Sequence, residues 1–391
     1  MELTPKQLEG LNIAVQRYRN HERYTVISGY AGSGKSTLVK FIVAALQVPE
    51  EQIIYACFTG KACNVLQQKG CKNVCTLHRL LYEWRPKKDG GFVRIPYTEL
   101  EYDIVIVDEV SMASKELMTQ LFTHDVYVIC LGDPFQLPPI NPDDDNHLLD
   151  SPHIFLDEIH RQAQESEIIR ISMDIRAQRL LEKFDGKDVK IIGREDLVNG
   201  MYTWADQILC ATNETRININ NEMRALAGLE GDPKDGDKII CLKNQWDILD
   251  SAGDPLVNGT IGYLKNPYSR TLILPYRLGG TKFEIINSDV VTETNTTFED
   301  LNMDKKLILT GQPALDWKTK YALNKNMKTQ WMVPMEFTYG YAITCHKAQG
   351  SQWDNVLVIE ERFPFAQEEH ARWLYTALTR AAKKLIIVKK D

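Results

Sequence analysis

Apolar runs alternate with amphipathic stretches through the first part of the chain. Residues 24–28 are β-branched and aromatic, which predicts a buried strand, and residues 36–46 have the apolar spacing of a helix. The apolar residues 104–107 predict a further strand, which ends in two carboxylates. Strands that alternate with helices are typical of an α/β domain with a parallel sheet, so we expect residues 1–155 to form one such domain.

A second α/β domain is predicted from the remainder, and it is split in sequence. Strand-like runs lie at 208–213, 355–359 and 385–388. They belong to two segments with the α/β pattern, which we assign to this domain as residues 156–235 and 335–391.

The segment between these halves, residues 236–334, has a different pattern. Its short apolar runs are separated by turn residues and lie at 238–242, 259–264, 270–274 and 282–286. This pattern predicts a small antiparallel β-barrel or sandwich inserted into the second α/β domain. Residues 299–330 are lysine-rich and polar, which predicts a helical or extended arm packed on the insertion.

A β-hairpin is predicted within residues 80–100. Two strand-like runs, 82–85 and 92–95, flank the turn-rich and basic segment 86–91. The residues by themselves fit a functional hairpin and an inconsequential surface loop equally well.

Composition sets broad limits on the class of protein. A chain of 391 residues is too long for one ordinary core, and 43% hydrophobic with 25% charged residues is typical of a globular protein in water. No apolar run approaches the ~18 residues of a membrane span, and the N-terminus has no signal-peptide core. The eight cysteines include no CxxC pair, which favours reduced thiols in a cytoplasmic compartment and no zinc site.

The net charge of −7 is mildly adverse to nucleic-acid binding. A narrow basic channel can nevertheless exist on an acidic protein, because the distribution of charge decides the local potential. Net charge therefore excludes no nucleic-acid partner here.

A complete phosphate-binding loop lies between the first predicted strand and helix. Glycines at such a turn let backbone N–H groups face phosphate oxygens, and the helix that follows adds its positive N-terminal end. Lys35 is predicted to contact the β- and γ-phosphates and Ser36 to complete a Mg²⁺ shell. The nucleotide-binding residues predicted from this loop are Gly29, Ala31, Gly32, Ser33, Gly34, Lys35, Ser36 and Thr37. The alternative is a glycine-rich turn that matches by chance.

Two adjacent carboxylates, Asp108 and Glu109, follow the predicted strand 104–107. The carboxyl edge of a parallel sheet is where open α/β folds place their ligands. We expect Asp108 to hold Mg²⁺ and Glu109 to orient or deprotonate an attacking water. In isolation, a pair of acids at a helix start would be the simpler interpretation, but the phosphate loop on the same chain favours ATP hydrolysis.

An ordered series of motifs resembles superfamily 1B, the RecD-like helicases, and most closely the Dda-like phage helicases. The matching segments are 3–7, 29–37, 56–62, 76–80, 108–112, 131–139, 156–162, 257–262, 341–351 and 373–381. The resemblance covers nearly the whole chain. It implies an α/β fold with two RecA-like P-loop NTPase domains, a small β-hairpin pin in the first and an SH3-like β-barrel insertion in the second.

The same resemblance implies roles for individual residues. Gln7 is expected to read adenine, and Gln136 to sense the γ-phosphate. Arg161 and Arg380 are expected to reach the nucleotide, although an isolated arginine is more often a surface ion-pair partner. The residues implied to bind single-stranded DNA are Thr59, Lys61, Thr76, His78, Thr344, His346 and Gln349, although either histidine alone is weak support. Either Trp84 or Phe92 is implied to stack at the fork as the pin, unless these rings only pack the hairpin.

The implied activity is that of a monomeric DNA helicase that uses ATP and Mg²⁺ and moves 5′-to-3′ on single-stranded DNA. Replication or recombination in a phage or bacterium is the implied setting, with partner proteins binding the β insertion. A P-loop phosphotransferase is a poorer alternative, because it needs no paired arginines on a second domain. An ATP-dependent single-stranded-DNA clamp or recombination loader with little unwinding remains open, and loss of unwinding without loss of translocation would favour it.

Overall fold

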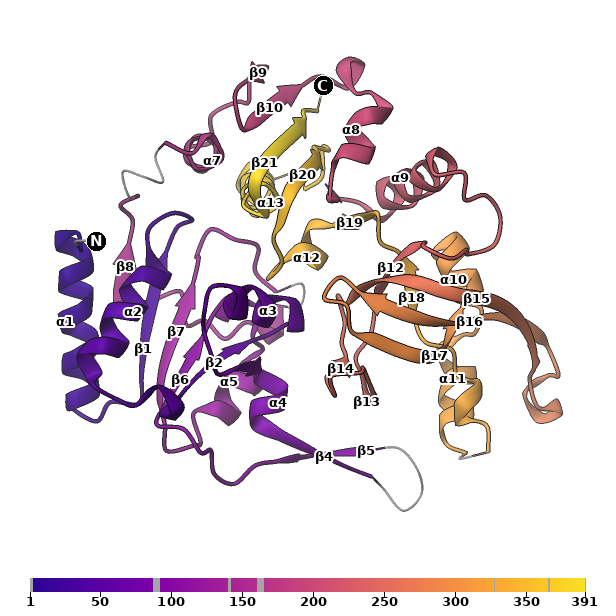
Figure 1. The fold of residues 1–391 in the computed structure, drawn as a ribbon, viewed down its shortest axis with the longest axis horizontal. Coiled ribbons are helices and arrows are strands. Elements are labelled where there is room, and N and C mark those ends of the chain that lie inside the picture. Colours follow the sequence, from indigo (N-terminus) through magenta and orange to yellow (C-terminus); the bar gives the residue numbers. More distant parts are fainter. Residues whose placement is uncertain are drawn as a thin grey trace. The chain divides into compact units, whose positions relative to one another are not determined.

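The computed structural model describes residues 3–86, 92–139, 142–159, 165–326, 328–364 and 366–390 (Figure 1). The chain divides into two compact units. Unit 1 comprises Met1–Glu83, Pro96–Ala211 and Thr344–Asp391, and unit 2 comprises Trp84–Ile95 and Thr212–Ile343. Arg161 lies outside the described residues, so its predicted role remains a prediction.

Unit 1 contains a six-stranded parallel sheet in the order β3-β2-β6-β7-β1-β8. Its strands are β1 Tyr24–Gly29, β2 Ile53–Cys57, β3 Val74–Thr76, β6 Ile104–Val107, β7 Tyr127–Gly132 and β8 Ile154–Leu156. The helices around it are α1 Pro5–Arg19, α2 Lys35–Leu46, α3 Gly60–Gln68, α4 Leu77–Leu81 and α5 Lys115–Leu121. The strands predicted at 24–28 and 104–107 and the helix predicted at 36–46 are therefore confirmed.

Both faces of this sheet are buried, which explains its continuous apolar strands. Successive residues point to opposite faces, so Val26 joins one core cluster and Ile27 the other. Leu38 and Ile42 of α2 pack in the cluster that contains Ile27, and Leu117 of α5 packs in the cluster that contains Val26. The carboxyl edge of the sheet is thereby held between rigid layers.

The second sheet of unit 1 has the order β11-β20-β21-β10-β9 within the unit, with β9 antiparallel. Its strands are β9 Phe184–Asp185, β10 Val189–Ile192, β11 Gln207–Cys210, β20 Trp353–Ile359 and β21 Ala381–Val388, and β19 Ala342–Thr344 spans the boundary of the two units. The associated helices are α7 Glu167–Arg176, α8 Asn199–Trp204, α12 Cys345–Ala348 and α13 Gln367–Leu378. The run predicted at 208–213 is too long, because Thr212 caps helix α9 and so ends the extended segment.

Unit 2 contains a five-stranded antiparallel sheet in the order β17-β16-β15-β12-β18. These strands are β12 Lys238–Cys241, β15 Ile261–Ile273, β16 Lys282–Thr292, β17 Thr297–Asp304 and β18 Phe337–Tyr339. A small second sheet pairs β13 Gln245–Leu249 with β14 Pro255–Leu256, and the helices are α9 Asn213–Leu226, α10 Lys305–Thr310 and α11 Trp317–Asn324.

Two predictions within unit 2 need correction. The runs 259–264 and 270–274 are one long strand, β15, because pairing with β16 continues past an irregularity between Lys265 and Tyr268. The predicted arm 299–330 begins as strand β17 and only then becomes helical, in α10 and α11. An SH3-like closure of these strands remains a prediction.

The hairpin predicted within 80–100 consists of β4 Tyr82–Pro86 and β5 Phe92–Pro96, which pair as a two-stranded sheet. Its connecting residues 87–91 lie outside the described residues, as do the side chains of Trp84 and Phe92. The choice between these rings for a pin is therefore a prediction that the structure does not test.

Two further sequence features have a structural counterpart. All eight cysteines are free thiols. Among the helices of the described ranges, none combines the length and the hydropathy needed to cross a membrane.

Candidate active site

The phosphate loop connects β1 to α2 at the carboxyl edge of the first sheet. Gly32 and Gly34 have φ angles of 77° and 80°, in the left-handed region that favours glycine. A Cβ on Gly29 would lie 2.6 Å from Ser33 Oγ and 2.8 Å from the carbonyl oxygen of Leu156. The glycines are thus required by the backbone path, and that path is the one a phosphate cradle needs.

Two side chains predicted to bind nucleotide lie against this loop. Lys35 Nζ donates to the carbonyl oxygens of Gly29 at 2.6 Å and Tyr30 at 3.1 Å, so its charge lies across the loop. Gln7 is buried, and its Nε2 donates to the Ser33 carbonyl oxygen at 3.4 Å. The other predicted loop residues, Ala31, Ser36 and Thr37, follow the same turn into the first residues of α2. Adenine recognition by Gln7 remains a prediction.

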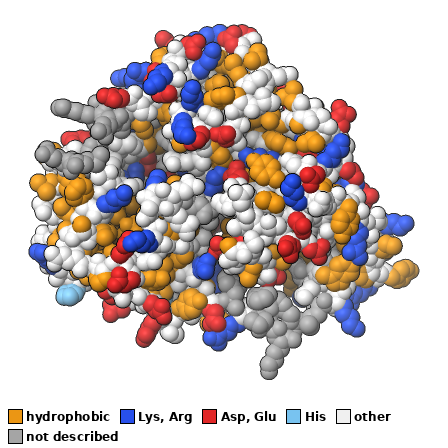
Figure 2. Space-filling model, viewed as in Figure 1, with side chains coloured by type: hydrophobic (Ala, Val, Ile, Leu, Met, Phe, Trp, Pro, Cys, Tyr) orange, Lys and Arg blue, Asp and Glu red, His pale blue; other side chains and the backbone are white. Residues whose placement is uncertain are grey.

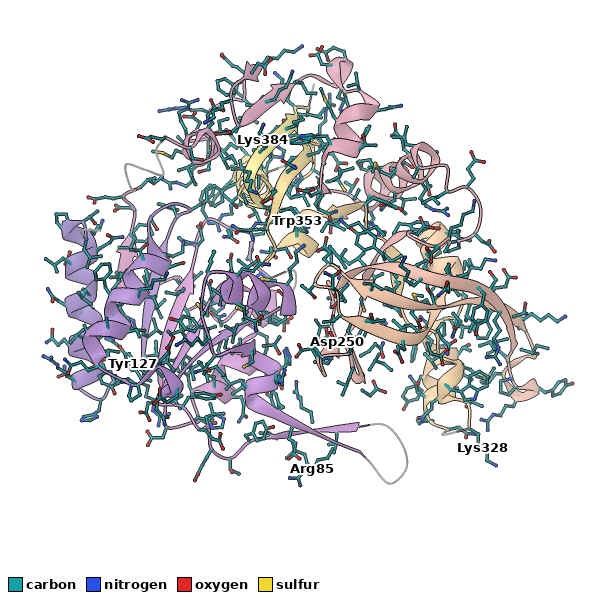
Figure 3. All side chains as sticks on the ribbon, in the orientation of Figure 1. Arg85, Tyr127, Asp250, Lys328, Trp353 and Lys384 are labelled. Atoms are coloured by element: carbon teal, nitrogen blue, oxygen red, sulfur yellow. The ribbon has the colours of Figure 1, made fainter. Side chains whose placement is uncertain are left out.

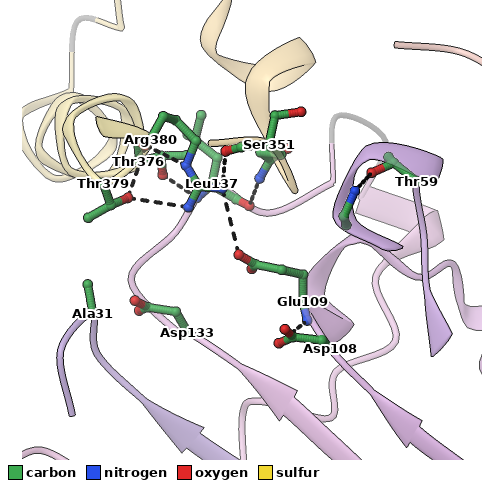
Figure 4. Close-up of polar contacts among 12 residues, drawn as sticks. Ala31, Thr59, Asp108, Glu109, Asp133, Leu137, Ser351, Thr376, Thr379 and Arg380 are labelled. Atoms are coloured by element: carbon green, nitrogen blue, oxygen red, sulfur yellow. Dashed lines mark hydrogen bonds and ion pairs between the residues drawn. The ribbon is translucent and has the colours of Figure 1, made fainter. Parts of the chain in front are cut away.

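The two acids at the end of β6 differ in environment. Asp108 Oδ1 accepts the Glu109 backbone N–H at 2.9 Å, and burial together with the Glu109 charge raises the pKa of Asp108 above its usual range. Glu109 has a φ angle of 51°, an uncommon left-handed conformation for a residue with a side chain. This conformation places its carboxylate apart from that of Asp108 (Figure 4).

Arg380, just beyond α13, brings a charge from the second sheet to Glu109. Its Nη1 lies 3.6 Å from Glu109 Oε1, and only 2% of the arginine is exposed (Figure 4). The remaining guanidinium contacts are with the Thr376 carbonyl oxygen at 3.1 Å, the Ser351 carbonyl oxygen at 3.4 Å and Thr379 Oγ1 at 3.3 Å. The arginine is therefore held in place by contacts with protein groups.

Tyr375 of α13, which the sequence analysis did not single out, makes a second contact with the first sheet. Tyr375 Oη donates to Asp133 Oδ2 at 2.6 Å and accepts the Ala31 backbone N–H at 2.8 Å. Burial raises the pKa of Asp133, and the Tyr375 hydrogen bond opposes that shift. One buried hydroxyl thus joins α13 to both the phosphate loop and the end of β7.

The loop after β7 is fixed from the same side. Leu137 N–H donates to Thr376 Oγ1 at 2.9 Å, and Gln349 Nε2 donates to the Leu137 carbonyl oxygen at 2.7 Å. The neighbouring Gln136 is buried, and its N–H donates to the Asp133 carbonyl oxygen at 3.3 Å. Gln136 thus lies near Asp133, and its predicted contact with the γ-phosphate remains a prediction.

Arg176, at the end of α7, was also missed. Its guanidinium carbon lies 3.3 Å from the ring centroid of Tyr30 in the phosphate loop. An arginine at the end of an amphipathic helix has no distinctive local pattern, so only the folded chain could identify it.

The residues predicted to bind a DNA strand fall into two groups. Thr59 and Thr76 cap α3 and α4, and Thr344 precedes α12, all of them half-buried. Lys61 Nζ lies 3.8 Å from the ring centroid of Trp353, and burial lowers the pKa of His346, which keeps that ring neutral at neutral pH. These five residues have at least partly exposed side chains.

His78 and Gln349 form the second group, because each is only 8% exposed. His78 packs edge-on against Phe58 with ring centroids 5.8 Å apart, and the Gln349 amide is bonded to Leu137. Direct contact with a strand was predicted for both, and it remains a prediction. Only a small part of either side chain is exposed, because His78 packs in the core and Gln349 lies between the two sheets of unit 1.

Comparison with known protein families matches two separate segments of the chain. Residues 2–190 match a family model described as an AAA domain, and residues 339–388 match a UvrD-like helicase C-terminal domain. The remaining segment, 191–338, includes most of unit 2.

Curated relatives include two bacterial or phage enzymes. The ATP-dependent RecD2 DNA helicase of Deinococcus radiodurans is 26% identical over 92% of this chain, and the match spans 46% of that protein. The ATP-dependent DNA helicase dda of Enterobacteria phage T4 is 30% identical over 36% of this chain and 34% of its own length. The chain thus spans less than half the length of the RecD2 helicase that it matches.

Among solved structures, a Pif1 helicase structure described for DNA unwinding at forked duplexes has a TM-score of 0.52. It is 18% identical and covers 99% of this chain and 92% of its own. A Bacteroides Pif1 structure bound to single-stranded DNA has a TM-score of 0.50 at 17% identity, with the same coverage. These similarities concern the fold.

Proposed function

Because this chain belongs to the RecD-like branch of the superfamily 1 helicases, we propose that it hydrolyses ATP and uses the energy to move along single-stranded DNA and open duplexes. The observation that carries this proposal is the contact of Arg380 and Tyr375 with the site on the first sheet. A motor needs an element on one domain that responds to the nucleotide on the other, and these side chains are placed to respond.

The loop and its neighbours fit a triphosphate and Mg²⁺. Ser36 and Asp108 offer the hydroxyl and carboxylate oxygens that Mg²⁺ prefers, and a bound cation would relieve the buried Asp108 carboxylate. Such an ion supplies positive charge for the phosphate oxygens. Lys35 would contact the β- and γ-phosphates, Gln136 the γ-phosphate and Gln7 the adenine edge.

Arg380 connects hydrolysis to movement. Its planar guanidinium is suited to bidentate contact with phosphate oxygens, so a γ-phosphate competes with Glu109 for it. Transfer of Arg380 to phosphate frees the Glu109 carboxylate to orient the attacking water. Loss of the γ-phosphate restores the Arg380–Glu109 pair, and this alternation provides two states of different affinity.

Strand contact and direction complete the proposal. We assign Thr59, Lys61, Thr76, Thr344 and His346 to the path of the strand, the 5′-to-3′ direction to the family, and strand separation to the hairpin β4–β5. Unit 2 is proposed to carry the SH3-like insertion, and the chain is proposed to act as a monomer.

Unwinding of matched duplexes with either a 5′ or a 3′ single-stranded tail tests the proposal. We expect opening of only the 5′-tailed duplex with ATP and Mg²⁺, loss of activity in Lys35→Ala, and retention in Lys40→Ala on the exposed side of the same helix. Preference for the 3′ tail would contradict the direction. DNA-stimulated ATP hydrolysis without any opening would instead favour a strand clamp or loader.

A further inference from the structure

Unit 2 has a second small core, separate from that of its main sheet. Leu272 and Phe283, at the far ends of β15 and β16, pack with Leu323 of α11 and Met332 of the following turn. The far end of the β15–β16 ribbon, α11 and residues 330–332 therefore form one body. We call this body the ribbon-end module and define it as residues 268–283, 314–326 and 328–334.

The ribbon-end module is strongly basic on an acidic chain. It contains Arg270, Arg277, Lys282, Lys318, Lys320, Lys325 and Lys328, against the single acid Asp316. Its net charge is thus +6, although that of the whole chain is −7. Lys320 is paired with Glu336, whereas Lys318 and Lys325 form no ion pair with any carboxylate in the described ranges. This concentration of charge favours a polyanionic ligand.

Exposed aromatic rings lie among these charges. Tyr276 is 97% exposed, Trp317 71%, Tyr321 56% and Trp331 50%, although none is needed to fill the core beneath. Figure 2 shows hydrophobic and basic side chains interspersed over the far ends of β15 and β16. Large exposed rings of this kind mark a surface with a ligand.

Helix α11 places rings and charges on one face. At 100° per residue, Trp317, Tyr321 and Lys325 follow one another at spacings of four and lie opposite the buried Leu323. Lys325 Nζ lies 4.4 Å from the ring centroid of Tyr321, and Lys328 continues beyond the helix (Figure 3). On the ribbon, the Arg270 guanidinium carbon lies 5.8 Å from the ring centroid of Trp331.

From this arrangement we propose that the ribbon-end module binds single-stranded nucleic acid, with bases stacked on Trp317 and Tyr321 and phosphates on Lys318 and Lys325. Rings offer any base a π-face, and adjacent cations track the backbone. A protein partner fits less well, because lysine is depleted from protein interfaces. The inference rests on the proposed function and adds a second contact between the protein and its single-stranded substrate.

Two double variants test the module in the full-length chain. Trp317→Ala/Tyr321→Ala removes the rings, and Lys318→Gln/Lys325→Gln removes the charges. These side chains are exposed, so the thermal unfolding midpoint should not change. The matched control is Lys187→Gln/Lys384→Gln, which removes two exposed charges from the second sheet of unit 1.

The measurement is fluorescence anisotropy with oligothymidylates of about 10 and about 30 nucleotides. A short strand fills only the path proposed on unit 1, whereas a long strand can also reach the ribbon-end module. We expect the ring variant to lose at least about 30-fold affinity for the long strand, and the charge variant to lower the salt slope of its binding by about 1.4. Affinity for the short strand and ATP hydrolysis at saturating DNA should match those of the parent. The control should keep the parental salt slope.

Retention of parental affinity for long strands in both variants would overturn the inference. Capture of a protein by the parental ribbon-end module would then assign this module to protein docking. Failure of the proposed function looks different, because the parent would then bind neither oligothymidylate. Cross-linking of a 5-bromouracil strand to the peptide that contains Trp317 gives a direct positive result.

Discussion

The Tyr375 hydroxyl is the smallest group whose removal tests the contact of α13 with the phosphate loop. Tyr375→Phe keeps the ring, which packs edge-on against Phe135 with centroids 5.2 Å apart, so no cavity forms. It removes the donor to the Asp133 carboxylate and the acceptor for the Ala31 N–H, and Tyr375 is fully buried. A buried group left without its partner costs about 1–3 kcal/mol, so for these two groups we expect a loss of about 2–6 kcal/mol in the free energy of unfolding.

The loss should depend on pH with a definite sign. The folded pKa of Asp133 is raised by burial, so folding is penalised while Asp133 is charged; the penalty begins to fall at the folded pKa and is lost below the unfolded pKa. The Tyr375 hydrogen bond reduces this penalty. Tyr375→Phe should therefore destabilise most at neutral pH, and the difference from the parent should narrow in acid.

The assay is urea unfolding followed by fluorescence, with the midpoint of the first transition compared at neutral and acid pH. Tyr339→Phe is the control, because the Tyr339 hydroxyl is buried and has no hydrogen-bond partner within the described part of the chain. Its removal should leave stability unchanged or slightly higher. Equal midpoints for the parent and Tyr375→Phe at neutral pH would refute the two bonds.

Three further substitutions address the candidate active site. Arg380→Lys should lower the rate constant of DNA-stimulated ATP hydrolysis by at least about 100-fold, because the planar bidentate contact is lost, whereas Arg179→Lys on the exposed surface should have no effect. Asp108→Asn should abolish hydrolysis yet raise the thermal unfolding midpoint at neutral pH without Mg²⁺, because burial penalises the charged Asp108. Since the folded pKa of Asp108 is raised, this gain in the midpoint should shrink as pH falls, and a lower midpoint at neutral pH would contradict the burial argument. Gly29→Ala should weaken binding of a fluorescent ATP analogue by about 10-fold or more, because the new Cβ meets backbone at 2.8 Å, while Gly200→Ala, with open space around its Cβ, should bind normally.

Much of unit 1 follows from local pattern. Continuous apolar runs predicted β1, β6, β20 and β21 because strands buried on both faces need no alternation. The phosphate loop was equally clear, since its glycines are required by backbone geometry within nine residues of sequence. The same local reasoning divided β15 in two, because Asn266 and Pro267 are typical turn residues. In the structure, pairing with β16 resumes at Tyr268, so the strand continues beyond them.

What the sequence determined by itself is therefore the order of the elements and the chemistry at each strand end, because both depend on neighbours a few residues apart. Only the tertiary structure decided which side chains meet. Asp133 and Tyr375 are 242 residues apart, and their contact depends on the face that α13 turns toward β7. The packing of distant elements likewise buries Gln349 against Leu137 and brings Arg270 beside Trp331. Such packing sets the environment of a side chain, and motif spacing does not.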